Sequence, residues 1–107
     1  MIRVAGKMKL LPGFQDEYKK RHDEIWPELK SLLLSKGIDD YSIFLDEETN
    51  SLFATLKVDD FTHLDELPGY DLMKKWWNYM KDIMETNADN SPVYIPLKEM
   101  FYLSENQ

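Results

Sequence analysis

The sequence has 107 residues, 43% of them hydrophobic, and its 13 basic and 20 acidic side chains give a net charge of −7. A single domain spanning residues 1–107 can bury about 60–70% of its unfolded surface, so the core needs no metal to complete it. The absence of cysteine excludes disulfides and thiolate chemistry, and the two histidines exclude a three-histidine metal centre. An acidic chain without a basic tract is a poor partner for nucleic acid, and its apolar runs are too short to span a membrane.

The first third of the chain predicts a strand followed by a helix. Residues 2–10 alternate between apolar and mostly basic side chains, which is typical of a strand with one buried face. Apolar residues then recur at helical spacing from Phe14 to Leu32. This pattern predicts one amphipathic helix, which Gly37 terminates.

The middle of the chain predicts a hairpin followed by two helices. Residues 38–46 and 52–58 alternate on either side of a polar turn, as antiparallel strands do. A short helix is expected after Asp60. A longer helix is expected from Leu72 to Ile83, where apolar residues recur every three or four positions.

The last segment completes the pattern of a four-stranded sheet. Turn formers at residues 87–92 predict a loop, and residues 97–103 predict a final strand. The element order is that of α+β proteins with the ferredoxin-like split β-α-β topology, in which helices cover one face of an antiparallel sheet. Phe44 and Phe53 have the parity of the opposite face, so we expect that face to pack against a second copy of the chain.

His22 is the candidate for proton transfer. Helical geometry places it near Tyr18 and Leu29, on the half of the helix that faces the sheet. An imidazole there can exchange a proton near neutral pH, or it can be a core histidine held by a backbone carbonyl. Pro27, five residues later, lacks an amide hydrogen and predicts a kink or a freed carbonyl beside this histidine.

Aromatic residues are the candidates for ligand binding. Trp76 and Trp77 are adjacent on one helix and point about 100° apart. Trp76 is therefore expected on the core side, and Trp77 in a cavity wall or a protein interface. Indole faces suit the C–H face of a sugar. Tyr18 and Tyr41 add hydroxyl groups, which can bind a ligand or the backbone.

Missing motifs narrow the chemistry further. The glycines form neither G-x-G-x-x-G nor a P-loop, and G-x-S-x-G is absent, so nucleotide cofactors and serine-hydrolase chemistry are not expected. His63 lies in a polar stretch and is assigned no role, and the acidic residues 46–48 are interpreted as a solvated turn. A small aromatic cavity with one histidine fits a neutral, polyhydroxylated ligand.

The chain as a whole resembles the L-rhamnose mutarotase family. The matching segments are M-I-R at 1–3, E-Y-K-K-R-H at 17–22, I-W-P-E-L at 25–29, Y-S-I-F-L at 41–45, W-W at 76–77, D-N-S-P at 89–92 and F-Y-L at 101–103. The resemblance implies that the fold is a dimeric α+β barrel. It implies an isomerase activity, in which the α and β anomers of L-rhamnose are interconverted without a cofactor. It also implies that His22 donates the proton and that the sugar contacts Tyr18, Tyr41, Trp76 and Trp77.

Anomer exchange opens the sugar ring and closes it on the other face, so an acid and a base must act together. In this interpretation His22 is the acid toward the ring oxygen, and a tyrosine, a water molecule or the Asp89 loop carries the second proton. Two other classes stay open: a monooxygenase of the same dimeric fold, with haem or without a cofactor, and a non-catalytic sugar-binding module. The family and the lack of an export signal lead us to expect a cytoplasmic protein.

Overall fold

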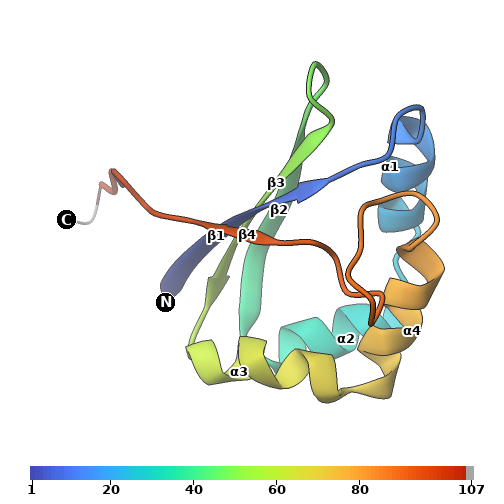
Figure 1. The fold of residues 1–107 in the computed structure, drawn as a ribbon. Coiled ribbons are helices and arrows are strands. Elements are labelled where there is room, and N and C mark those ends of the chain that lie inside the picture. Colours follow the sequence, from blue (N-terminus) through green and yellow to red (C-terminus); the bar gives the residue numbers. More distant parts are fainter. Residues whose placement is uncertain (106–107) are drawn as a thin grey trace.

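The computed structural model describes residues 1–105, which form a four-stranded antiparallel sheet with its helices on one side (Figure 1). The strands are β1 (Ile2–Lys9), β2 (Ile38–Asp46), β3 (Ser51–Val58) and β4 (Ile95–Leu97), in the spatial order β2-β3-β1-β4. The helices are α1 (Gln15–Asp23), α2 (Pro27–Ser35), α3 (Phe61–Glu66) and α4 (Asp71–Met80), with a 3-10 turn, η1, at Leu67–Gly69. This confirms the α+β class and the split β-α-β order.

Alternation along the strands decides which side chains meet the helices. Met8 on β1 pairs with Leu52 on β3, and both are buried in a core that also contains Leu29 of α2 and Trp76 of α4. Side chains one residue away point to the other face of the sheet. The inner face of the sheet is therefore the floor on which the helices pack.

The outer face of the sheet also carries large apolar groups, as the sequence predicts. Phe44 on β2 lies directly opposite Phe53 on β3, and Phe44 exposes 65% of its surface. Such an apolar pair on a sheet face is a candidate contact surface for another molecule.

The prediction of one helix from Phe14 to Lys36 is wrong, because residues 24–26 are not helical and separate α1 from α2. Pro27 becomes the first residue of α2, where its missing N–H costs nothing and its fixed φ suits a helix. Trp26 before it is extended, with φ −58° and ψ 131°, as the residue preceding a proline prefers to be. The predicted irregularity beside His22 is confirmed, since the His22 carbonyl accepts a hydrogen bond from the Ile25 amide at 3.2 Å.

The last strand is also shorter and earlier than predicted. β4 pairs with β1 only over Ala5–Lys7, and the predicted strand at residues 97–103 forms only at its first residue. The following residues, here called the C-terminal arm (residues 98–105), extend away from the body (Figure 1). Its large apolar side chains are among the most exposed of the described chain: Met100 at 85%, Phe101 at 78% and Leu103 at 77%. The apolar side chains that predicted a strand here therefore stay largely exposed.

The end of α4 differs slightly from the prediction as well. The helix stops at Met80, and Ile83, expected on it, lies in the turn that follows. Ile83 is nevertheless fully buried in the core. It therefore extended the apolar pattern of α4 in the sequence because it is buried, although it does not lie on the helix.

Candidate active site

A hollow of about 1300 Å³ lies between the inner face of the sheet and the helices. Small-molecule sites typically measure about 300–1,000 Å³, so a small ligand would fill only part of it. The sequence-predicted site residues all line this hollow: Tyr18, His22, Tyr41, Trp76 and Trp77. They come from α1, β2 and α4, three segments that the fold brings together.

His22 is fixed by its own helix and by two aromatic rings. Its Nδ1 lies 3.1 Å from the backbone oxygen of Tyr18, one helical turn earlier. Its ring stacks on the Tyr18 ring with centroids 4.3 Å apart, and Trp76 meets it edge to face at 5.4 Å. A carbonyl oxygen can only accept, so this contact assigns the proton to Nδ1 and leaves the Nε2 lone pair of a neutral ring free for a ligand.

The surroundings of His22 favour its neutral form. Burial lowers the pKa of His22 below its usual 6.5, and it outweighs the opposing effects of the Tyr18 carbonyl and the Asp23 charge. At neutral pH the imidazole is therefore uncharged and ready to accept a proton at Nε2. Sequence reasoning left open whether this side chain is held by a carbonyl or exchanges protons, and the geometry allows both at once.

Phenol hydroxyls gather in the same hollow. Burial raises the pKa of Tyr18, with a smaller contribution from nearby Tyr41, and burial also raises the pKa of Tyr41 to about 12, with a contribution from Tyr94. Tyr41 still exposes 44% of its surface, so its pKa reflects the protein around the hydroxyl and not a sealed ring. Within residues 1–105 none of these three hydroxyls makes a hydrogen bond, and that of Tyr18 is not sealed from solvent. All three phenols are therefore protonated donors available to a ligand.

The two adjacent tryptophans divide as the helical geometry predicts. Trp76 is 6% exposed and packs edge to face on Trp26 at 5.0 Å, whereas Trp77 is only partly buried at the margin of the core. Trp26 also lies 5.6 Å from the Tyr79 ring, so it packs at the edge of this aromatic group. Trp76 and Trp77 give the helix side of the hollow two indole groups for the apolar face of a ligand.

Arg21, next to the histidine, ties α1 to the end of α4. Its guanidinium donates to Glu17 at 2.7 Å, to Asp82 at 2.9 Å and to the backbone oxygen of Tyr79 at 2.6 Å. It also lies 4.4 Å from the centre of the Tyr79 ring. This cross-link fixes the helix that carries His22 against the helix that carries the tryptophans.

The remaining candidates lie outside the hollow. His63 bonds the Asp59 carboxylate at 2.8 Å and the Lys36 carbonyl at 3.0 Å, which are contacts of a structural residue. Asp89 accepts a hydrogen bond from the Ser91 amide at 3.0 Å and does not line the hollow, so it is poorly placed to carry a proton there. Residues 1–105 contain no group of three or more potential metal ligands and no helix long and apolar enough to cross a membrane.

Tyr94, in the loop before β4, is a lining residue with a polar group that sequence reasoning missed. The available signal was Gly6, because an isolated glycine inside an alternating strand often marks the close approach of another group. The structure shows that group to be the Tyr94 ring.

The chain is similar to known proteins along nearly its whole length. The family model described as L-rhamnose mutarotase matches residues 3–103. The chain belongs to the L-rhamnose mutarotase family. An L-rhamnose mutarotase of Formosa agariphila is 54% identical over 103 residues, covering 96% of this chain and 99% of the relative. One of Flavobacterium johnsoniae is 57% identical over 102 residues, covering 95% of each chain.

The fold agrees with that of a solved member of the family. The crystal structure of L-rhamnose mutarotase from Formosa agariphila matches with a TM-score of 0.91 and 53% sequence identity, covering 97% of this chain and 100% of that one. The mutarotase resemblance stated from the sequence motifs is thereby confirmed along nearly the whole chain.

Proposed function

We propose that this protein is a mutarotase that interconverts the α and β anomers of L-rhamnose in the hollow between sheet and helices. His22 transfers the proton, and Tyr18, Tyr41, Trp76 and Trp77 contact the sugar. The observation that carries the proposal is a neutral imidazole whose Nδ1 is engaged, beside phenol hydroxyls; within residues 1–105 neither its Nε2 nor these hydroxyls have a hydrogen-bond partner.

The chemistry follows from these protonation states. Nε2 of His22 accepts the proton of the anomeric hydroxyl, while a phenol such as Tyr18 or Tyr41 donates one to the ring oxygen. The bond between C1 and the ring oxygen breaks, which leaves an aldehyde at C1 and a hydroxyl at C5. Rotation about C1–C2 and closure on the other face return both protons to their donors.

The neutral state of His22 favours a first step in which it accepts a proton, whereas the family resemblance implies a donor. The two roles follow each other in one cycle, because the imidazolium formed on ring opening is the acid of ring closure. The reaction needs only proton transfers and a positioned sugar. Indole faces of Trp76 and Trp77 suit the apolar side of the pyranose and its methyl group.

Exchange of magnetisation between the two anomeric protons, measured by saturation-transfer NMR, tests the proposal. His22→Ala is expected to lower the enzymatic exchange rate by about 10²- to 10⁴-fold. His63→Gln is the matched control, because this second histidine lies outside the hollow, and it is expected to leave the rate within twofold. A folded His22→Ala protein that exchanges anomers as fast as the parent refutes the assignment.

The same assay separates the alternative classes. A sugar-binding module would bind L-rhamnose, seen as a change in tryptophan fluorescence, without accelerating exchange. A monooxygenase that uses haem would give a spectral shift on haem addition and no acceleration. Running L-rhamnose beside L-fucose, L-mannose and D-ribose establishes the preferred sugar.

We further propose that the chain forms a homodimer, a dimeric α+β barrel in which the outer sheet face packs against a second copy. The support is the exposed Phe44, which lies opposite the half-buried Phe53, together with the exposed apolar side chains of the C-terminal arm. Sedimentation at micromolar concentration is expected to give a dimer that Phe44→Asp dissociates. Leu34→Asp, at a residue 57% exposed on α2, should leave it intact. A monomeric parent protein contradicts the proposal.

A further inference from the structure

Gly6 leaves room for a side chain from a distant part of the sequence. It lies in the middle of β1 with the parity of Val4 and Met8, which line the hollow, so a side chain at position 6 would point into it. A methyl group added to Gly6 would overlap ring carbons and the hydroxyl oxygen of Tyr94. The phenol of Tyr94 therefore lies directly on the backbone of β1.

Backbone conformation does not explain why a glycine stands at position 6. Only Gly13 and Gly37 among the glycines of the chain have positive φ, so the backbone at Gly6 is one that any residue can adopt. Its neighbours across the sheet are Ala54 on β3 and Pro96 on β4, neither of which carries a long side chain. The side chains at these three neighbouring positions are short, and the Tyr94 ring occupies the space that they leave over the sheet.

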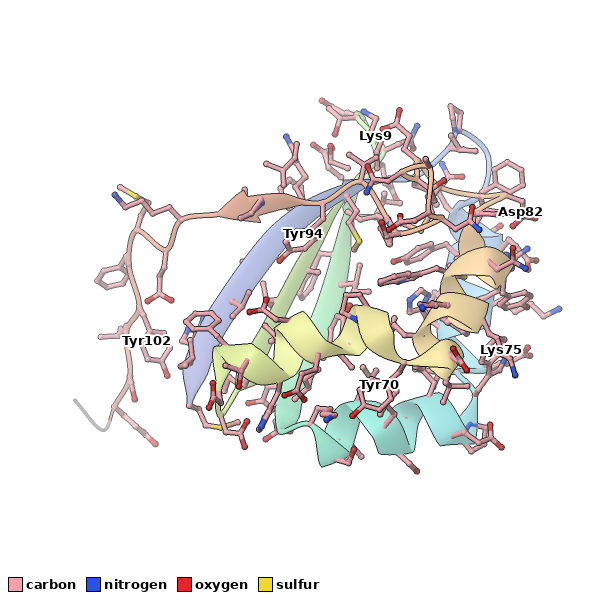
Figure 2. The ribbon with its side chains drawn as sticks, turned by 60° about the horizontal axis from the view of Figure 1, so that its bottom comes forward. Lys9, Tyr70, Lys75, Asp82, Tyr94 and Tyr102 are labelled. Atoms are coloured by element: carbon pink, nitrogen blue, oxygen red, sulfur yellow. The ribbon has the colours of Figure 1, made fainter. Side chains whose placement is uncertain are left out.

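This placement brings the Tyr94 hydroxyl to the sheet side of the hollow. Figure 2 shows Tyr94 extending from the loop before β4 beside the sheet, on the side that the helices occupy. The hydroxyl is near enough to Tyr41 to affect its ionisation, and within residues 1–105 it makes no hydrogen bond. Trp76 and Trp77 enter the same hollow from the helix side. A ligand between these walls meets an unpaired phenol hydroxyl.

We propose that Tyr94 is a further sugar-binding residue, whose hydroxyl donates a hydrogen bond to the oxygen at C2, C3 or C4 of the pyranose and whose position depends on Gly6. The proposal rests on the mutarotase function proposed above. Because these three carbons do not react, the contact determines which sugar is held and how firmly. Tyr94 takes no part in the proton transfer itself.

The first experiment removes only the hydroxyl. Tyr94→Phe is expected to lower kcat/KM for L-rhamnose by about threefold to tenfold, the usual effect of one neutral hydrogen bond. Tyr102→Phe is the matched control, since that ring lies on the C-terminal arm beneath the Arg3 guanidinium, away from the hollow (Figure 2). It should leave kcat/KM unchanged.

Sugar analogues distinguish a contact from a structural role. The loss caused by Tyr94→Phe is measured with L-rhamnose and with its 2-deoxy, 3-deoxy and 4-deoxy analogues. The loss should vanish for one analogue, the one that lacks the partner hydroxyl. An equal loss for all four sugars, or no loss for L-rhamnose, overturns the proposal.

A second experiment tests the dependence on Gly6. Gly6→Ala should lower kcat/KM at least as much as Tyr94→Phe, because the added methyl displaces the ring. In a Tyr94→Ala background the same substitution should have almost no further effect. Independent effects of the two substitutions contradict the proposed dependence.

Failure of this inference differs from failure of the proposed function. If the parent protein does not accelerate anomer exchange, the mutarotase proposal fails. If the parent accelerates it, His22→Ala does not, and Tyr94→Phe behaves like the parent with every sugar, only the role of Tyr94 is refuted.

Discussion

Replacing Arg21 should show how strongly the active-site helix is held in place. Arg21→Gln keeps a side chain of similar shape but removes the positive charge and the forked donors. The Arg21 side chain is only 10% exposed, whereas its partners Glu17 and Asp82 are 42% and 63% exposed. The loss therefore comes from the guanidinium contacts and not from two acids left unpaired in the core.

The magnitude follows from the contacts. Each exposed ion pair contributes about 0.5–1 kcal/mol, the bond to the Tyr79 carbonyl about 1 kcal/mol, and the contact with the Tyr79 ring about 0.5–1 kcal/mol. Together these predict a loss of about 2.5–4 kcal/mol in the free energy of unfolding. For a domain of this size the loss lowers Tm by on the order of 10 °C or more.

Lys19 on the same helix provides the control. It pairs with Asp23 at 2.8 Å, but the two side chains are 76% and 62% exposed, so Lys19→Gln should cost less than about 0.5 kcal/mol. Urea unfolding followed by tryptophan fluorescence measures both. Equal losses in the two variants, or a loss below about 0.5 kcal/mol for Arg21→Gln, would refute the reasoning from burial.

Three further predictions concern pH and packing. The kcat/KM of anomer exchange should rise with pH through the lowered pKa of His22, because only the neutral imidazole accepts a proton; a profile whose midpoint lies above 6.5 contradicts this. Leu29→Ala, at a residue 1% exposed, should cost about 2–5 kcal/mol in urea unfolding, whereas Leu34→Ala on the exposed side should cost less than about 1 kcal/mol. The hydrogen bond to Asp59 raises the pKa of His63, so its stabilisation is present below pH 6.5 and is lost as pH rises through the raised value. The stability difference between the parent and His63→Gln should accordingly shrink between pH 5.5 and pH 8.5, and a difference that grows would show the sign to be wrong.

Local periodicity predicted most of the fold because burial on one side produces it directly. β1, β2 and β3 were predictable for this reason, and so was the two-sided apolar character of the hairpin. The helix break at Pro27 was harder to predict, since Tyr18 on α1 and Leu29 on α2 both bury against the same core. Two separate helices that pack on one core can therefore give the same apolar pattern as one continuous helix.

In the C-terminal arm the apolar pattern predicts a strand that the structure does not form. Apolar residues at 100–103 predict a strand, yet within residues 1–105 the strand pairing of this segment ends at Leu97. Strand length depends on a partner as well as on propensity. Sequence alone does not say whether that partner belongs to the same chain.

The candidate site was predictable where residues carry their own chemistry or match the family motifs. His22 and the two adjacent tryptophans belong to that group, and the structure places them in one hollow. Tyr94 was missed because nothing in its neighbourhood along the chain distinguishes it. Its place depends on Gly6, nearly ninety residues earlier, and only the sheet register brings the two together.

The break between α1 and α2 also affects how this chain can diverge. In an uninterrupted helix, one inserted residue turns everything beyond it by about 100° and would reorient the whole downstream face. Here the helical path is already interrupted between Glu24 and Trp26, so such a rotation is not passed on from α1 to α2. A change in length at this connector would act through Ile25 and Trp26, which pack against the core, so its cost would come from that packing and not from rotation of the whole downstream face.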